Sequence, residues 1–425
     1  MKKRILIIVG SLGMRGASRS LAETLDLRLC RDFECVIALP QGDGPFLASI
    51  EKMDVTIIRA QQPYWVTRND VDHWLYGMRQ IPEAVRQLRT QIRALKVDLV
   101  FTNCGLTPVG ALAANEEGLP HVWYLRECFK NPATGLRFYP GQSVLAKVVS
   151  ETSSRLMVVS NAVREEYLAY AESTPIHVIP SGINVQQYFC ERLAKDFFRI
   201  LSVGTTSQGK GLDDLVEAAR LLQQSKMDFI INVLGSFDDK HYERTIRARL
   251  VKYDLEDVIQ LHGWREDSID WYAHSDMLCC PSHAESFGRS VVEGMASGLP
   301  VVATRCGGPD ELVLDGVTGY LVPSQNPRLL ADSIRSLIND PERGISMGRA
   351  GRYRAQSLYD IQHSAHEWSR ALQETLTSSP ATSGSGILEL LLNVLDEAKP
   401  RMLLGRKYWL VSRLAHYIGR PIVGE

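Results

Sequence analysis

The sequence lacks an excess of charge of either sign. Its 425 residues include 48 Lys and Arg against 49 Asp and Glu, which gives a net charge of -1 at pH 7. Proteins that bind nucleic acid usually carry a strongly positive surface. The balance therefore predicts that nucleic acid is not a partner.

Long apolar runs are also missing. No stretch of the sequence approaches the roughly 20 apolar residues that a membrane-spanning helix needs. The run in the N-terminal MKKRILIIVG is only about seven residues long and is followed by glycine-rich polar sequence, unlike a signal peptide. We expect a first buried strand there and only peripheral association with any membrane.

Cysteine pairs with CxxC spacing are absent as well. The eight cysteines are scattered and form no CxxC motif. Such spacing is typical of reduced, packed thiols in a cytoplasmic protein and offers no metal-ligand pattern. We therefore expect a cytoplasmic protein with neither disulfide nor metal site.

The composition that is present, 45% apolar and 23% charged, is that of a globular protein long enough for two or three domains. In the first half, short β-branched runs alternate with amphipathic stretches, which predicts buried parallel strands in a Rossmann-like domain. The expected strands are Arg4–Val9, Val36–Leu39, Val55–Arg59, Asp98–Thr102, His121–Leu125, Leu156–Val159 and His177–Ile179. A covering helix is predicted over Pro82–Leu95, with apolar residues at helical spacing.

The same rhythm restarts near Phe198, with a helix whose apolar face carries Leu212, Leu215, Val216, Ala219 and Leu222. The fold class is therefore α/β, with two Rossmann-like domains facing each other across a cleft that holds ligands. The expected strands of the second domain are Arg199–Val203, Phe229–Leu234, Val258–Leu261, Asp276–Cys280 and Pro300–Thr304.

The predicted domain plan has six parts. They are an N-terminal Rossmann-like domain 1–180, an interdomain linker 181–197, a second Rossmann-like domain 198–357, a helix 358–377 returning to the first domain, a flexible linker 378–386 rich in small residues, and a basic helical extension 387–425. The spacing of apolar residues predicts an imperfect amphipathic helix over Leu403–Ile418, so residues 400–420 could meet a membrane surface, a partner protein or the body of the chain.

The segment Pro281–Val302 carries the chemistry. It contains two carboxylates eight residues apart, Glu285 before a predicted helix start and Glu293 within the helix, so both can reach one ligand at the carboxyl edge of the sheet. The backbone N–H groups of Ser286, Phe287 and Gly288 are uncapped donors suited to a diphosphate. The alternative is an ordinary surface helix that begins with two glutamates.

This segment resembles the Glu-x7-Glu signature of retaining glycosyltransferases of the GT-B fold, most like family 4. The resemblance extends over about 350 residues, and its order and spacing agree throughout. The further matching segments are Ile179–Asn184 as the "IPNGVD" turn, Val203-Gly204 with Lys210-Gly211 as the "VGR…KG" loop, and Gly307–Glu311 with Asp315–Gly319 after the second glutamate.

The resemblance implies roles for the matching residues. Glu293 would accept the ribose hydroxyls, Glu285 the hydroxyls of the donor sugar, and Lys210 would neutralise the diphosphate leaving group. Gly204 and Thr205 would line the donor phosphates. The donor is a nucleoside diphosphate sugar, and no cofactor or metal is expected. The alternative for Lys210 is a solvated loop lysine.

Thr205 departs from the family pattern, which has an arginine there as a second phosphate clamp. Either another cation substitutes, Arg289 being the candidate, or the donor is held more weakly; the sequence leaves both open.

In the first domain the family often carries a histidine where this chain has Arg126. Arg126 could donate to an acceptor or to donor phosphates with Glu127 orienting it, or the two could form a structural strand-end pair. Gly13 and Gly16 resemble the glycine-rich loop that closes against donor and acceptor. Ser18 stands at the usual glutamate position of that loop.

The function that the resemblance implies is that of a retaining glycosyltransferase, which would move a sugar to a hydroxyl of a glycan or lipid-linked acceptor in polysaccharide or glycoconjugate assembly. The alternatives are an epimerase or sucrose-synthase-like enzyme of the same fold, and an inactive member that binds sugar nucleotide as a scaffold. The expected place is the cytoplasm, peripherally on the membrane face.

Overall fold

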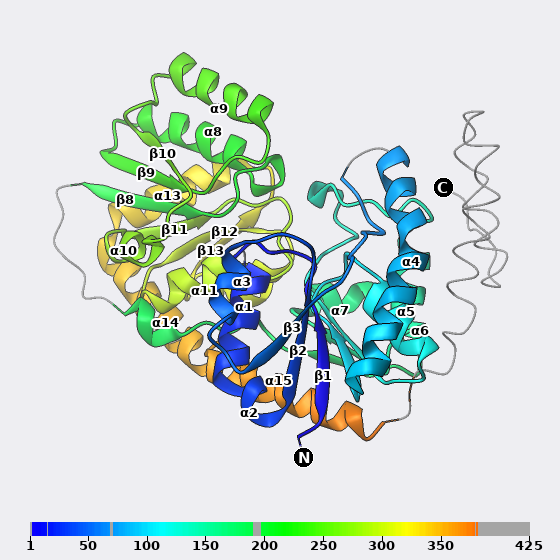
Figure 1. The fold of residues 1–425 in the computed structure, drawn as a ribbon. Helices are drawn as coiled ribbons and strands as arrows, with labels where there is room; N and C mark the ends of the chain where they lie inside the picture. Colours follow the sequence, from blue (N-terminus) through cyan, green and yellow to red (C-terminus); the bar gives the residue numbers. More distant parts are fainter. Residues whose placement is uncertain (1, 15, 69–70, 190–196, 379, 381–425) are drawn as a thin grey trace. The chain divides into compact units, whose positions relative to one another are not determined.

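The computed structural model describes residues 2–14, 16–68, 71–189, 197–378 and 380, and divides the chain into two compact units (Figure 1). The first unit comprises residues 1–180 and the C-terminal segment from Ser364, and the second comprises Ser181–His363. Apart from residues 378 and 380, the predicted linker 378–386 and the extension 387–425, with its basic helix, lie outside the described residues.

The first unit is built on a seven-stranded parallel sheet in the order β3-β2-β1-β4-β5-β6-β7. Its strands are almost fully apolar because helices cover both faces of such a sheet. The strands are β1 (Arg4–Ile8), β2 (Glu34–Leu39), β3 (Val55–Arg59), β4 (Leu99–Thr102), β5 (His121–Leu125), β6 (Arg155–Val158) and β7 (Ile176–Val178).

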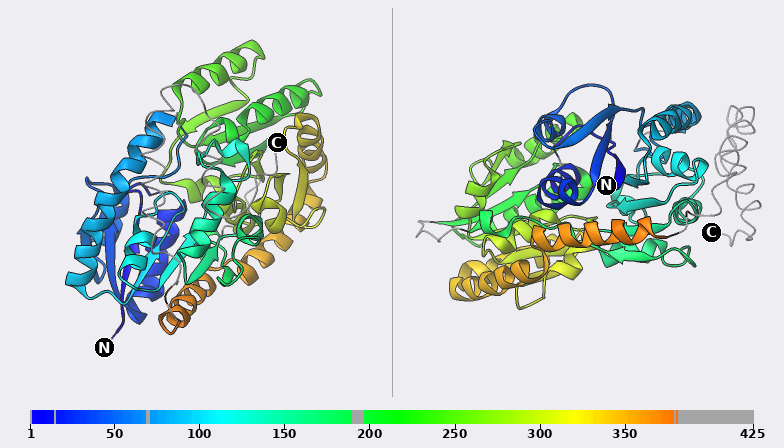
Figure 2. Two further views of the ribbon diagram at one scale, coloured as in Figure 1. Left: turned by 90° about the vertical axis from the view of Figure 1, so that its right-hand side faces the viewer. Right: turned by 60° about the horizontal axis from the view of Figure 1, so that its bottom comes forward.

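Helices of the first unit follow its strands in turn. They are α1 (Gly16–Thr24), α2 (Cys30–Asp32), α3 (Pro45–Ile50), α4 (Val71–Leu95), α5 (Val109–Glu116), α6 (Gln142–Glu151), α7 (Asn161–Tyr167) and the C-terminal α15 (Ile361–Leu376). Helix α15, orange in Figure 2, lies against the first sheet, where the fully buried Trp368 packs on Phe101 and Tyr124 with ring centroids 5.5 and 4.6 Å apart.

The second unit repeats the plan on a six-stranded parallel sheet in the order β10-β9-β8-β11-β12-β13. Its strands are β8 (Phe198–Val203), β9 (Phe229–Leu234), β10 (Ile259–Gly263), β11 (Met277–Cys280), β12 (Val301–Arg305) and β13 (Gly319–Pro323). Its helices are α8 (Leu212–Gln223), α9 (Lys240–Lys252), α10 (Ser268–Ala273), α11 (Arg289–Ala296), α12 (Gly308–Leu312), α13 (Pro327–Asn339) and α14 (Pro341–Leu358). Two parallel Rossmann-like sheets confirm the α/β prediction.

The predicted strands agree with the observed ones to within two residues at every end. The sequence reading missed β13, an edge strand that begins with a glycine and ends with a proline, residues that ordinarily argue against a strand. The predicted apolar face of α8 is buried at all five positions.

The predicted start of a helix at Pro82 was wrong. Helix α4 begins at Val71 and contains Pro82 in its interior. Upstream of the proline, Trp74, Met78 and Ile81 are buried and continue the helical spacing of Val85. Burial of this longer apolar face outweighs the hydrogen bond that proline removes.

Residues 181–189, which the sequence reading placed in a linker, belong to the second unit in the structure. Ile183 is fully buried, donates its N–H to the Tyr359 carbonyl oxygen at 3.0 Å, and accepts from the Ile361 N–H at 2.8 Å. Tyr188 is also buried and packs edge-on against Tyr272.

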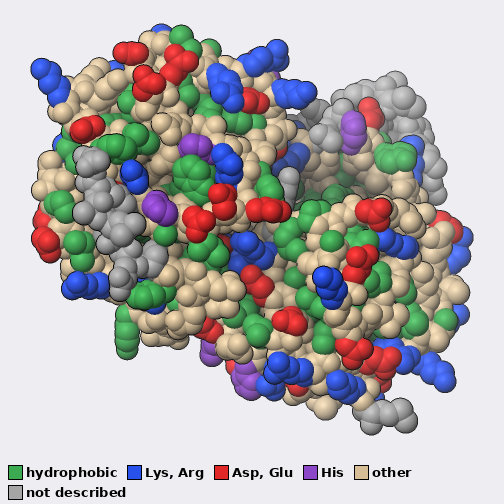
Figure 3. Space-filling model, turned by 60° about the vertical axis from the view of Figure 1, so that its left-hand side comes forward, with side chains coloured by type: hydrophobic (Ala, Val, Ile, Leu, Met, Phe, Trp, Pro, Cys, Tyr) green, Lys and Arg blue, Asp and Glu red, His purple; other side chains and the backbone are tan. Residues whose placement is uncertain are grey.

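Acidic and basic side chains are interspersed over the face shown in Figure 3, as the balanced composition leads one to expect. Among the described helices, none combines the length and the apolar character needed to cross a membrane.

One consequence of the fold concerns acid stability. Burial lowers the pKa of His121, the first residue of β5, to about 3, and in the unfolded chain the pKa returns to about 6.5. Protons therefore bind the unfolded chain more readily than the folded one. The contribution of the neutral His121 ring to the free energy of unfolding is complete above pH 6.5 and falls as the pH drops toward 3. We expect a loss of about 2 kcal/mol from this group between pH 7 and pH 5.

Urea unfolding of His121→Asn at both pH values checks this expectation, because the variant lacks the titrating ring and should lose less stability on acidification. The exposed His366→Asn, in the same unit, is the matched control and should behave as the parent. Equal acid sensitivity of parent and His121→Asn would contradict the assignment.

Candidate donor-binding site in the second unit

Lys210 and Glu285 meet at the carboxyl edge of the second sheet. Lys210 ends a 3-10 turn, Gln208–Lys210, in the loop after β8, and Glu285 lies in the loop after the neighbouring strand β11. The Lys210 ammonium donates a hydrogen bond to Glu285 Oε2. The structure therefore brings together two residues that the sequence prediction assigned to adjacent parts of one donor, the diphosphate and the sugar.

Backbone contacts hold the two loops together. Gly211 has a φ of +68°, and a Cβ atom there would lie 1.9 Å from the Pro281 carbonyl oxygen. The His283 N–H donates to the Gly209 carbonyl oxygen at 2.8 Å, and His283 Nε2 lies 2.9 Å from Asp214 Oδ2. A glycine at 211 is required both by the left-handed backbone and by this close approach.

The Lys210–Glu285 pair keeps the lysine charged. Burial lowers the pKa of Lys210, but the attraction of the Glu285 carboxylate and its hydrogen bond outweigh burial, so the pKa lies above the ordinary lysine value. A permanent positive charge at this edge suits a ligand whose negative charge grows during reaction.

Lys210 also lines a small hollow in the second unit. The hollow lies between the loop after β8 and the loop after β11. Its wall includes Gly204, Thr205, Lys210, Pro281 and Ser282. Thr205, which stands in place of the family arginine, is thus a neighbour of the lysine.

Glu293 lies on α11 and is nearly fully buried. Its Oε1 accepts from Arg289 Nε at 3.0 Å, and its Oε2 accepts from the Tyr272 hydroxyl at 2.8 Å. Burial and the Glu293 charge raise the pKa of Tyr272 well above its ordinary value, so the hydroxyl stays a donor. Arg289, the candidate replacement for the missing phosphate clamp, is ion-paired with Glu293 in this structure.

The loop before α11 supplies anion donors. Helix α11 begins at Arg289, with Gly288 at the N-cap and no side-chain cap. Among the described residues, the backbone N–H groups of Phe287 and Gly288 find no acceptor. Ser286 is adjacent in the same loop, and Gly308 lies so close that a Cβ there would be 2.1 Å from the Phe287 carbonyl oxygen. Unpaired N–H groups at a helix start favour a negatively charged ligand.

Arg126 and Glu127 lie at the carboxyl edge of the first sheet. The Arg126 guanidinium is 4.2 Å above the centre of the Tyr124 ring and donates to Ser20 Oγ at 3.3 Å. Glu127 Oε2 accepts from the backbone N–H groups of Gly105 at 2.9 Å and of Arg126 at 3.2 Å, and burial raises the pKa of Glu127. Glu127 thus fixes the backbone at Arg126.

Gly13 and Gly16 lie in the first unit, in the loop after β1 and at the first residue of α1. A Cβ at Gly13 would meet only Ser11 Oγ, at an ordinary 3.6 Å, among the neighbours within 4 Å. A close backbone approach to the loop after β1 is made instead by Gly44, which lies between β2 and α3. A Cβ at Gly44 would lie 2.7 Å from the Leu12 carbonyl oxygen.

The sequence reading did not single out three residues that complete the second-unit site: Tyr272, His283 and Asp214. Tyr272 comes from α10 and Asp214 from the first turn of α8, both outside the motif, so only the tertiary structure could find them. Within the described residues, no three His, Cys, Asp or Glu side chains are grouped so as to hold a metal ion.

Two protein-family models match this chain. The model described as "Glycosyltransferase Family 4" matches residues 15–187, and "Glycosyl transferases group 1" matches residues 188–354. A D-inositol 3-phosphate glycosyltransferase of Kineococcus radiotolerans is 30% identical over 295 residues, 61% of this chain and 68% of that protein. The chain belongs to the group 1 glycosyltransferases of the GT-B fold.

Other similar proteins agree with this family. An uncharacterized glycosyltransferase of Methanocaldococcus jannaschii is 29% identical over 283 residues, 65% of this glycosyltransferase and 75% of the relative. Anabaena HepE, solved in complex with UDP and glucose, has a TM-score of 0.70 at 21% identity, with 88% of this chain and 100% of that chain covered. At this identity the likeness to HepE shows the shared fold alone.

The contact between Gly211 and Pro281 generates a stability test. Gly211→Ala should lower the free energy of unfolding by clearly more than the roughly 1–2 kcal/mol that a left-handed alanine costs, because its Cβ also displaces the Pro281 carbonyl. Gly316→Ala is the matched control, since Gly316 has a φ of +75° and nothing within 4 Å of the added Cβ. Urea unfolding measures both, and equal losses would show that the two loops are not held in contact.

Proposed function

We propose that the protein transfers a sugar, with retention of configuration, from a nucleoside diphosphate sugar to a hydroxyl of a glycan or lipid-linked acceptor. The single observation that carries this proposal is the pairing of Lys210 with Glu285 beside uncapped backbone donors in the second unit. The family of the chain, and a relative that acts on an inositol phosphate, support a transfer reaction.

The proposed mechanism follows from where charge develops. The bond between the anomeric carbon and the diphosphate oxygen breaks, and that oxygen takes the electron pair. The Lys210 ammonium and the N–H groups of Phe287 and Gly288 stabilise this charge. The acceptor hydroxyl oxygen bonds to the anomeric carbon, and its proton passes to the departing diphosphate.

The carboxylates position the donor in this proposal. Glu293 accepts the ribose hydroxyls while Tyr272 and Arg289 hold its side chain in place, and Glu285 accepts hydroxyls of the sugar. No step in the proposal uses a cofactor or a resident metal.

The direct experiment is a panel of radiolabelled nucleoside diphosphate sugars incubated with the purified protein, first alone and then with candidate acceptors. We expect slow hydrolysis of one donor, and transfer whose product keeps the anomeric configuration of the donor by NMR. Sugar nucleotide that binds but is neither hydrolysed nor transferred would favour the scaffold alternative.

The ribose role of Glu293 predicts a binding defect. Glu293→Gln keeps the size of the side chain but removes the charge, so UDP should bind about 1.5–3 kcal/mol more weakly by calorimetry. The control is Glu243→Gln on α9, a partly exposed carboxylate of the same unit that pairs with Arg247. Unchanged UDP affinity in Glu293→Gln would refute the ribose role.

The leaving-group role of Lys210 predicts a catalytic defect. Lys210→Ala should lower turnover about 100-fold or more, because one donor to the developing charge is lost. The free energy of unfolding should change little, since the Lys210 side chain is about one-third exposed. Lys240→Ala, on the exposed first turn of α9, should leave turnover unchanged. Normal turnover in Lys210→Ala would show that Lys210 does not stabilise the leaving group.

A further inference from the structure

Two cysteine thiols meet in the first unit, at the amino edge of its sheet. Cys30 is the first residue of α2, and Cys35 is the second residue of β2. Their side chains are hydrogen-bonded to each other. The connection from α2 to β2 enters the sheet at the amino ends of its parallel strands, whereas ligands of doubly wound sheets bind at the carboxyl ends. The pair is therefore no part of the donor-binding site.

The turn between the two cysteines is held in place by its own contacts. Phe33 is buried, and its backbone N–H donates to the Leu29 carbonyl oxygen at 2.9 Å. The Asp32 carboxylate accepts from the Ser369 hydroxyl of α15. A turn fixed in this way keeps both thiols in one arrangement.

The two thiols differ in exposure. Among the seven cysteines that the structure describes, Cys30 and Cys306 are partly exposed and the others are buried. Cys35 is only 1% exposed. Cys30 is therefore the member of the pair that is open to a reagent from solution, and its neighbour is a second thiol.

The charge of the pair also favours reaction at Cys30. The hydrogen bond with Cys35 lowers the pKa of Cys30 and outweighs burial and the carboxylates of Asp54 and Asp26, which raise it, while Lys2 lowers it further. The same hydrogen bond and burial raise the pKa of Cys35. Because the thiolate is the reactive form of cysteine, the nucleophile of the pair is the partly exposed sulfur.

We propose that Cys30 and Cys35 form a modification site at which a hydroperoxide converts the two thiols into an intramolecular disulfide. The Cys30 thiolate attacks the terminal oxygen of the hydroperoxide, the O–O bond breaks, and the departing oxygen takes the electron pair and a proton. Cys30 is thereby oxidised to a sulfenic acid.

Cys35 completes the reaction. Its sulfur bonds to the Cys30 sulfur, the S–O bond breaks, and the hydroxide leaves with the Cys35 proton as water. The pair loses two electrons, and the hydroperoxide is reduced to an alcohol, or to water when it is hydrogen peroxide. The Cβ atoms of a disulfide lie about 3.8 Å apart, and two thiols in hydrogen-bonding contact are already near this arrangement.

Peptide mapping of the full-length reduced protein tests the proposal. The protein is treated with hydrogen peroxide, its remaining thiols are blocked with N-ethylmaleimide, and it is digested with trypsin. Cleavage after Arg28, Arg31 and Lys52 places the two cysteines in separate peptides, 29–31 and 32–52. We expect these peptides to be found linked, lighter by two hydrogen atoms than their sum, and to separate after treatment with dithiothreitol.

Two results of the mapping would overturn the proposal. In the first, peptides 29–31 and 32–52 both carry N-ethylmaleimide after peroxide has oxidised other cysteines of the chain. In the second, Cys30 is linked to a cysteine other than Cys35.

Two variants separate the steps of the reaction. Cys35→Ser keeps a hydrogen-bond donor beside Cys30 but cannot form the disulfide, so the sulfenic acid at Cys30 should persist and react with dimedone. Cys30→Ser removes the nucleophile and should leave Cys35 unoxidised. Far-UV circular dichroism that matches the parent shows that both variants are folded.

Cys306 is the matched control, because it is also partly exposed but burial raises its pKa. In Cys35→Ser, dimedone should label Cys306 at least about tenfold less than Cys30. Cys306→Ser should form the linked peptide at the parent rate. Equal labelling of Cys30 and Cys306 would show that the Cys30 thiol is not activated by its place in the fold and would overturn the proposal.

Discussion

The contact between the Gly211 backbone and the Pro281 carbonyl oxygen is the constraint on which the second-unit site depends. It brings the loop after β8 against the loop after β11 more closely than any residue with a Cβ would allow. Lys210 precedes the glycine and Glu285 follows the proline by four residues, so this backbone contact places their side chains within hydrogen-bonding distance. The chemistry of the site is thus set by main-chain geometry, and the side chains follow from it.

The charged side chains of the site have partners before any ligand arrives. Glu293 is held between a guanidinium and a tyrosine hydroxyl, and Lys210 is held by a carboxylate. A lone buried carboxylate would be driven toward its protonated form. Because each charge already has a partner, a ligand at this candidate site would exchange hydrogen bonds and would not have to order free side chains. Such preorganisation is what electrostatic stabilisation of a leaving group requires.

Local signals sufficed for most of the fold and for the core of the site. The β-branched runs are short and mostly apolar, as expected of strands buried on both faces, and the spacing of Glu285 and Glu293 follows from a helix that begins after a strand. The extension of α4 through Pro82 and the edge strand β13 escaped prediction because tertiary burial overrides proline and glycine signals there. Tyr272 and Asp214 meet their partners only through folding, so no spacing in the sequence could reveal them.

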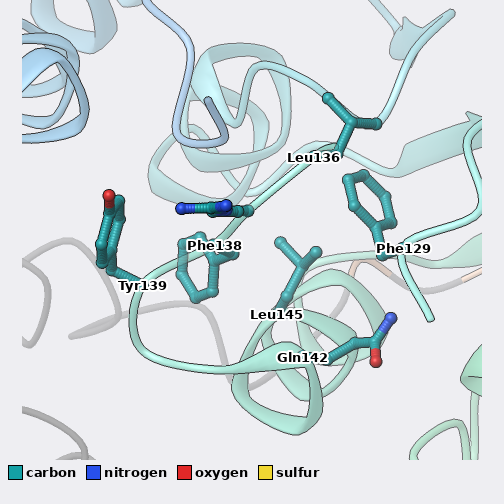
Figure 4. Close-up of a pocket in the computed structure, with 7 residues that line it drawn as sticks. Phe129, Leu136, Phe138, Tyr139, Gln142 and Leu145 are labelled. Atoms are coloured by element: carbon teal, nitrogen blue, oxygen red, sulfur yellow. The ribbon is translucent and has the colours of Figure 1, made fainter. Parts of the chain in front are cut away.

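The two sheets share one topology but carry different chemistry at their carboxyl edges. The edge of the second sheet is ionic, with lysine, arginine and two carboxylates close to the backbone. In the first unit, the loop after β5 carries Arg126 and Glu127 at its start and further on presents aromatic and aliphatic side chains (Figure 4) backed by Trp65 and Trp74. Parallel sheets fix only where the loops emerge, and the loop residues decide what binds there. A division of this kind suits a reaction that joins a charged, water-soluble donor to a second substrate of different polarity, because each unit can then select its ligand by a separate physical property.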